Sequence, residues 1–314
     1  MWRGEPDSLV VTTDDGASIH YLHWGSAAGE QTAQGAALPD LPPLVLIHGL
    51  GATAWAWTPV ARRLAPLTKV VALDLRGHGL SDSPRAGYDL ESLAFDALTV
   101  MSANGWGTDI GGPSAVVAGH GLGAMVAAAM AATRPGSVAA VALVDSGWED
   151  LAEATGMTAA EFERTLGDPP EVLASMDAFL ADRREYDPDS WDTDQERAVR
   201  STVDEKYAGH VAPVVRAHVR RAAVESMFSY PPQLAATLPQ PVLVAVAEAG
   251  TADDDTTQER LAALDDFRSD RARNGLPDPI IRRFPGAGHN LMRYRPDELS
   301  ATLLELAQQA HQRS

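Results

Sequence analysis

Short apolar runs alternate with segments of helical spacing along most of the chain. Six of these runs have the length and composition of buried strands: Leu44–Ile47, Val70–Leu73, Ala115–Ala118, Val138–Val144, Val242–Val246 and Ile280–Phe284. A hairpin precedes them, with strands at Ser8–Thr13 and Ser18–Trp24. Helical patterns follow a polar loop within residues 251–279 and close the chain at residues 296–312. The pattern predicts an α/β protein with a mostly parallel, eight-stranded sheet and helices on both faces.

The strand pattern is interrupted from Trp148 onward, where helical spacing takes over. Acidic and Arg-rich positions there interleave with Leu, Phe, Met and Trp, which is typical of amphipathic helices. We therefore predict a core made of residues 1–147 and 237–314, with residues 148–236 inserted as a helical cap. Residues 27–42, rich in Ala, Gly, Gln and Pro, predict a flexible surface loop.

Composition limits the classes of partner and the cellular compartment that we expect for this chain. The formal net charge is −18 and the isoelectric point is near 4.8, which argues against a nucleic-acid partner because phosphate backbones are bound by clustered Lys and Arg. The chain has no cysteine, so disulfides, thiolate catalysis and Cys-ligated metals are excluded. Its first residues lack a secretion signal, and no apolar run is long enough to span a bilayer. We expect a cytoplasmic protein with no membrane partner, no cofactor and no metal, and a homodimer remains open.

A strand, a sharp turn and a helix follow one another around residue 121. The apolar run Ala115–Ala118 breaks into the sequence GHGLG at residues 119–123 and then into an Ala-rich helix. In a nucleophile elbow of the pattern G-x-S-x-G, the middle residue takes a strained backbone conformation and the flanking glycines let strand and helix approach closely. Here the middle residue is Gly121, which has no side chain to attack a substrate.

A second turn, with the sequence HGLG at residues 48–51, follows the predicted strand Leu44–Ile47. This turn suits an oxyanion hole, in which backbone N–H groups stabilise the charge that develops on a carbonyl oxygen. The motif takes one donor from the residue after the nucleophile, here Leu122, and one from this loop, here Leu50. Both donors belong to the backbone, so they persist whatever residue occupies position 121.

Two further segments complete a set of four motifs: DLRGHGLSD at residues 74–82 and GAGHN at residues 286–290. Together with the two turns, they occur in the order and spacing of the α/β-hydrolase superfamily, and the chain resembles its serine-hydrolase branch over nearly the whole length. The resemblance implies the α/β-hydrolase fold, with Gly121 at the nucleophile position. It also gives His289 the role of general base, because a loop after the last strand can hold its imidazole over the elbow. The other histidines of these motifs fall within structural turns: His48, His78 and His120.

The acid that would orient His289 has three candidates. Family members often carry it after the seventh strand, but the matching stretch of this chain has Gly250 where an Asp is expected. We favour Asp145, at the end of the sixth predicted strand and 24 positions past the elbow. A subgroup with the acid there includes hydrolases that resemble those opening the macrolactone of zearalenone. Glu248 and Asp253 are the other two candidates.

The missing hydroxyl leaves three explanations open. Acyl transfer on this fold needs an oxygen nucleophile at the elbow, and the epoxide- and haloalkane-cleaving branches need an Asp there. In the first explanation, Gly121 replaces a native Ser and disarms an ester or lactone hydrolase. In the second, the chain is a natural enzyme that uses His289 directly in non-hydrolytic or cofactor-free chemistry. In the third, it is a natural binding protein with a dead site. Survival of the other motifs favours the first.

Pocket walls on this fold come from the cap and from the loops that follow the strands. In this chain those segments carry apolar and aromatic side chains: Leu50, Trp55, Trp57, Trp148, Met157, Trp191, Tyr207, Met227, Phe228 and Met292. Such a pocket favours a small, uncharged, hydrophobic ester or lactone over a phosphate, and the resemblance extends this to a macrolactone such as zearalenone. We expect substrate contacts from Gly49, His120 and Trp148, and also from Leu50.

Overall fold

The computed structural model describes residues 4–25, 41–166, 175–207, 209–250 and 255–313. Most of the surface loop predicted at residues 27–42 lies outside these ranges, as does the candidate acid Asp253.

The core of the molecule is an eight-stranded sheet with the order β1-β2-β4-β3-β5-β6-β9-β10. The two strands nearest one edge, β1 and β2, run antiparallel to their neighbours, and all pairs from β4 to β10 are parallel. This arrangement confirms the predicted fold class, and every predicted strand is present to within two residues. The strands are β1 (Asp7–Thr12), β2 (Ser18–Trp24), β3 (Leu44–Ile47), β4 (Val70–Leu73), β5 (Ala115–His120), β6 (Val138–Val144), β9 (Val242–Glu248) and β10 (Ile280–Pro285).

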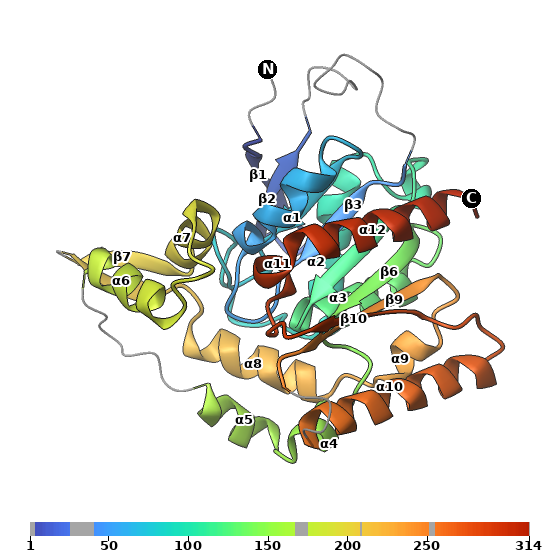
Figure 1. Ribbon diagram of the computed structural model, residues 1–314. Coiled ribbons are helices and arrows are strands. Elements are labelled where there is room, and N and C mark those ends of the chain that lie inside the picture. The colour runs from blue at the N-terminus through green and yellow to red at the C-terminus, as the bar shows by residue number, and fades with distance from the viewer. Residues whose placement is uncertain (1–3, 26–40, 167–174, 208, 251–254, 314) are drawn as a thin grey trace.

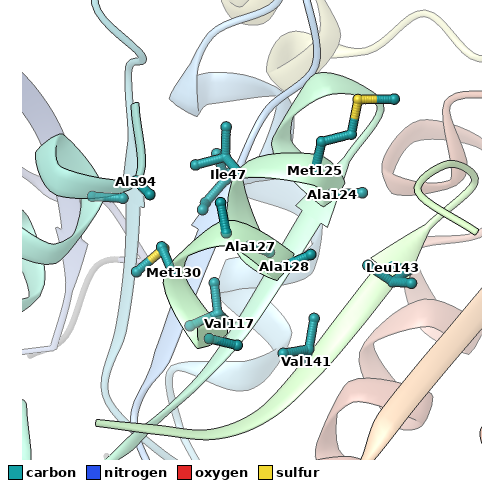
Figure 2. Close-up of a cluster of buried hydrophobic side chains, with 14 of the residues drawn as sticks. Ile47, Ala94, Val117, Ala124, Met125, Ala127, Ala128, Met130, Val141 and Leu143 are labelled. Atoms are coloured by element: carbon teal, nitrogen blue, oxygen red, sulfur yellow. The ribbon is translucent and has the colours of Figure 1, made fainter. Parts of the chain in front are cut away.

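Helices cover both faces of the sheet. Neighbouring residues of a strand point to opposite sides, so a central strand such as β3 contributes side chains to a buried cluster on each face. On one face, Val45 and Ile47 belong to a cluster that includes buried side chains of α2 (Leu90–Ala103), α3 (Leu122–Thr133), α9 (Gln233–Ala236) and α10 (Asp255–Arg273). Figure 2 shows part of this cluster, with the side chains of α3 gathered among those of β3, β5, β6 and α2. On the other face, Leu44 and Leu46 pack with α1 (Thr58–Leu64), α11 (Leu291–Tyr294) and α12 (Pro296–His311).

The inserted segment between β6 and β9 is mostly helical, as predicted, and also carries a short hairpin that was not predicted. In Figure 1, α4, α5 and α8 lie together, whereas α6, α7 and the hairpin form a separate lobe at the side. The hairpin strands are short and polar, and Val203 and Val211 are the residues they contribute to a small buried cluster. The elements are α4 (Leu151–Thr155), α5 (Ala159–Thr165), α6 (Met176–Tyr186), α7 (Thr193–Arg200), β7 (Val203–Tyr207), β8 (His210–Pro213) and α8 (Ala217–Phe228).

Two 3₁₀ turns complete the described elements, at Ala54–Trp57 and Thr108–Ile110. Among the described helices, none combines the length and the apolar character that crossing a bilayer requires. The carboxyl ends of the parallel strands converge on one edge of the sheet, where open α/β sheets bind their ligands.

Candidate active site

The turn between β5 and α3 has the backbone of a nucleophile elbow. Gly121 has φ 55° and ψ −123° and directly precedes the first residue of α3, a conformation that glycine adopts freely. A Cβ atom at Gly119 would overlap the carbonyl oxygen of Gly123, and one at Gly123 would overlap the carbonyl oxygen of Ile47. The two flanking glycines are therefore required by close approach of the backbones.

Position 121 has room for a side chain. A Cβ atom built on Gly121 would lie 3.5 Å from the Cα of Gly49 and 3.7 Å from the Nε2 of His289, both ordinary contact distances. A hydroxyl carried one bond further could therefore come within hydrogen-bond reach of the imidazole. Glycine at this position leaves His289 facing an unfilled side-chain site.

His289 and Asp145 form a hydrogen-bonded pair beside the elbow. The Nδ1 of His289 lies 2.7 Å from the Oδ2 of Asp145. Because an ionised carboxylate can only accept, this contact places the proton on Nδ1 and leaves the lone pair on Nε2. The His289 side chain is 61% exposed and the Asp145 side chain only 2%, so the imidazole is accessible while its partner is buried.

The buried carboxylate of Asp145 is held by donors from other elements. Its Oδ1 accepts hydrogen bonds from the backbone N–H of Ala247 and from the guanidinium of Arg260, both at 2.8 Å. Asp145 directly follows β6 and has a φ of 55°, uncommon for a residue with a side chain.

The structure brings Asp145, and not Glu248, to His289. Glu248 lines the nearby cavity, but its carboxylate forms an ion pair with Arg283 on the neighbouring strand β10. Of the three candidate acids, Asp253 lies outside the described residues.

His120 supports the loop that carries His289. Its Nε2–H donates to the carbonyl oxygen of His289 at 3.0 Å, and the two rings are 4.2 Å apart between centroids. Burial and the neighbouring His289 lower the pKa of His120 to about 3, so the ring is neutral. A Cβ atom at Gly49 would lie 2.9 Å from the Nδ1 of His120, which explains the glycine there.

A cavity of about 350 Å³ opens from Gly121 and His289 toward the cap. One part of its wall is apolar, with Leu151, Phe162 and Met227 from the cap helices and Leu261 from α10. The other part is polar and continuous, because Asp145, Glu149 and Arg260 contact one another in series. An apolar cavity with a few convergent polar groups is typical of a small-molecule site.

Three of the four predicted substrate contacts, Gly49, His120 and Trp148, are not among the residues that line this cavity. Gly49 and His120 pack against each other, as described above. Trp148 is 2% exposed and lies in the core cluster. The guanidinium carbon of Arg260 lies over the Trp148 ring, 4.9 Å from the ring centroid. Of the other side chains predicted for the pocket walls, Met227 lines it, whereas Leu50 packs against the core cluster.

Sequence reasoning missed Glu149 and Arg260, two of the charged residues that line the cavity. Burial raises the pKa of Glu149. Burial alone would lower the pKa of Arg260, but the carboxylates of Asp145 and Glu149 outweigh it and raise that pKa. Glu149 has a weak sequence signal, four positions after Asp145 in the same strand-end loop. Arg260 lies on α10, whose sequence carries no motif.

The two residues predicted to donate to an oxyanion, Leu122 and Leu50, follow the ends of β5 and β3. Leu122 is the first residue of α3, where helix N–H groups have no partner within the helix. The turn that carries Leu50 is fixed by His48, whose Nδ1–H donates to the carbonyl of Gly49 at 2.7 Å and whose Nε2 accepts from the backbone N–H of Leu75 at 3.0 Å. Within the described residues, no group of three or more His, Asp or Glu side chains is arranged to hold a metal ion.

Comparison with known proteins adds three findings. A family model described as the alpha/beta hydrolase family matches residues 44–302. The 2-(acetamidomethylene)succinate hydrolase of Mesorhizobium japonicum is 28% identical over 170 residues, covering 54% of this chain and 58% of that protein. The non-heme chloroperoxidase of Streptomyces lividans is 34% identical over 139 residues, covering 44% of each. The matched region thus spans about half the length of these relatives.

A solved structure shares nearly the whole fold. The crystal structure of E-2-(acetamidomethylene)succinate hydrolase superposes with a TM-score of 0.74 at 21% identity, covering 96% of this chain and 98% of that one. At this level of identity the likeness supports the fold alone.

Proposed function

The chain belongs to the alpha/beta hydrolase family, and from that premise we propose that its site is built to hydrolyse carboxylic esters or lactones of uncharged, hydrophobic substrates. In this chain the site takes a form without a nucleophile, because Gly121 stands where the family's acyl transfer needs a hydroxyl. One observation carries the proposal: the hydrogen-bonded pair of His289 and Asp145 faces the unfilled side-chain position 121.

The proposed mechanism applies to a chain with serine at position 121. The Ser oxygen attacks the carbonyl carbon while the Nε2 of His289 takes its proton and Asp145 holds the imidazole in place. The backbone N–H groups of Leu50 and Leu122 stabilise the oxyanion. The C–O bond to the alcohol then breaks, His289 returns the proton to that alcohol, and water hydrolyses the acyl-enzyme.

With glycine at position 121 the covalent step is impossible. Loss of the nucleophile from such a unit costs on the order of 10⁶ in kcat. The chain then binds substrate, and only slow attack by a water deprotonated at His289 remains. Replacement of a native Ser explains best why the base, its acid and the elbow backbone are all retained. A natural enzyme that uses His289 alone is the second candidate, favoured by the exposure of that imidazole.

The cavity supports a neutral substrate. Its volume of about 350 Å³ falls in the range of small-molecule sites, and cap residues make much of the wall apolar. Within the polar wall, Asp145 and Glu149 carry two carboxylates against the one guanidinium of Arg260. A dicarboxylate such as the succinate derivative named for the Mesorhizobium relative would meet an excess of negative charge. A macrolactone such as zearalenone carries no charge.

The test is to restore the hydroxyl. We expect Gly121→Ser to hydrolyse members of a panel of p-nitrophenyl esters and lactones at least about 10³-fold faster than the parent chain. Gly121→Ala is the matched control for adding a side chain, and the double variant Gly121→Ser with His289→Ala controls for the base. If Gly121→Ser is no faster than Gly121→Ala on the whole panel, the proposed function is wrong. Zearalenone, followed by mass spectrometry, tests the macrolactone separately, and an unopened ring rejects only that substrate.

A further inference from the structure

We propose that Arg260 is a positioning residue of this site, which acts through Asp145 to keep the imidazole of His289 facing position 121. The inference rests on the proposed function and deepens it, since nothing in the motifs of the chain singles out this arginine. It also assigns a role to α10, which follows β9 and otherwise packs on one face of the sheet.

The contacts of Arg260 join the ends of two strands. One terminal nitrogen donates to the Oδ1 of Asp145 at 2.8 Å and to its carbonyl oxygen at 3.4 Å. The other terminal nitrogen donates to the carbonyl oxygen of Ala247 at 3.3 Å. Asp145 follows β6 and Ala247 lies in β9, so a single guanidinium bridges both strand ends. It also hydrogen-bonds both the backbone and the side chain of Asp145.

The guanidinium is itself held on two further sides. Its Nε lies 3.4 Å from the Oε2 of Glu149, and its central carbon lies over the ring of Trp148, 4.9 Å from the ring centroid. The planar fork of arginine matches this combination of carboxylate, carbonyls and ring, which a lysine ammonium cannot reproduce. The Arg260 side chain is 20% exposed and lines the cavity.

Asp145 needs such support for two reasons. Its φ of 55° lies in a region that is unfavourable for a residue with a side chain. Its carboxylate is buried, and a buried charge is tolerated only when it is paired and hydrogen-bonded. Arg260 supplies the formal charge and one of the two donors to Oδ1, and the backbone N–H of Ala247 supplies the other.

The positive charge of Arg260 distinguishes a positioning role from direct stabilisation of the charge that forms at His289. The reaction creates an imidazolium at His289, which the cation of Arg260 disfavours and the carboxylates of Asp145 and Glu149 favour. The neutral ring of His120 packs against His289, and Glu248, which also lines the cavity, is paired with Arg283. Loss of Arg260 should therefore slow the reaction through lost geometry while making protonation of His289 easier.

The test compares Arg260→Met and Arg260→Lys in the Gly121→Ser background. Its control is Arg268→Met, an exposed arginine on the same helix whose ion pairs lie with Asp265 and Asp278. The rate of inactivation by a fluorophosphonate is measured from pH 5 to 9, with circular dichroism to verify folding. We expect Arg260→Met to lower the rate about 10- to 100-fold and to move the acidic limb to higher pH by about half a unit or more. Arg260→Lys should restore the position of the acidic limb but only part of the inactivation rate. Arg268→Met should change neither the limb nor the rate.

An activity-independent measurement separates failure of this inference from failure of the proposed function. In the chain with Gly121, the proton that His289 shares with Asp145 should give a downfield ¹H NMR signal, which Asp145→Asn removes. We expect Arg260→Met to broaden or lose the signal and Arg268→Met to retain it. If Arg260→Met keeps the signal, the positioning role is wrong even if Gly121→Ser is active. If Gly121→Ser is inert but the signal depends on Arg260, the proposed function fails and the positioning role stands.

Discussion

The φ of 55° at Gly121 makes this position easy for glycine and costly for any residue with a side chain. We predict that Gly121→Ala and Gly121→Ser each lower the free energy of unfolding by about 1–2 kcal/mol. The surroundings add no steric penalty, because a Cβ atom would meet only ordinary contacts. Urea unfolding of both variants measures the effect. A loss above about 4 kcal/mol would contradict the room for a side chain at position 121, and a gain would contradict the backbone strain.

Glu149 offers a prediction about substrate charge. In the Gly121→Ser background, we expect Glu149→Gln to raise kcat/KM for a half-ester bearing a free carboxylate, relative to its neutral methyl diester, by about 3- to 10-fold. The reason is that Arg260 then loses one of its two carboxylate partners.

Acid should act on the same ratio. Because burial raises the pKa of Glu149, the carboxylate protonates at a higher pH than an exposed Glu. Lowering the pH through that raised pKa should therefore increase the half-ester ratio in the chain with Glu149, more than in Glu149→Gln. The ratio is compared between pH 7.5 and pH 5. An equal pH dependence in both chains would show that Glu149 does not set the charge preference.

The positions of the candidate site residues were predictable only where a motif pointed to them. His289 and Gly121 follow from short patterns next to strand ends, and Asp145 from its place after β6. Arg260 was not predictable, because the side of α10 that reaches the cavity depends on how the helix packs. The burial of Trp148 in the core was not predictable for the same reason, since a side chain just past a strand can turn either into the core or toward the cavity.

Among the elements, the turn after β4 depends on a buried carboxylate. Asp74 accepts hydrogen bonds from the Nδ1 of His20 at 2.7 Å and from the backbone N–H groups of Ala54 at 2.7 Å and Leu80 at 2.9 Å. Burial alone would raise the pKa of Asp74, but these bonds outweigh it and lower the pKa. One side chain thus joins β2, the 3₁₀ turn Ala54–Trp57 and the loop after β4.

We predict that Asp74→Asn lowers the free energy of unfolding by about 2–4 kcal/mol at pH 7. A carboxyl whose pKa is lowered by folding stabilises the protein above its unfolded pKa, near 4, and loses that contribution as the pH falls through the lower folded value. The difference between the two chains should therefore narrow below about pH 4. Urea unfolding at pH 7 and at pH 3.5 checks this, and a difference that stays constant would contradict it.

The strands were predictable to within two residues because buried parallel strands are continuous apolar runs with turn residues at both ends. The hairpin of β7 and β8 was not, since its strands are short and bury few side chains. Alternation is too weak a signal over four or five residues to stand out between amphipathic helices.

For the whole molecule, the net charge of −18 should make stability depend on salt. Self-repulsion destabilises a compact state of high net charge, and salt screens it. Exposed ion pairs, such as those of Arg62 and Arg197 with Glu5, weaken in salt but are each worth little. We predict that Tm rises by about 3–6 °C between 20 mM and 500 mM NaCl. A fall in Tm would mean that the ion pairs dominate.

The most direct test of the central claim is intact-protein mass spectrometry of Gly121→Ser after incubation with a fluorophosphonate. If the pair of His289 and Asp145 can activate a hydroxyl at position 121, each chain should gain the mass of one phosphonyl group. Gly121→Ala should gain none, and Gly121→Ser with His289→Ala should react far more slowly. A Gly121→Ser chain that folds normally yet keeps its original mass would contradict the account.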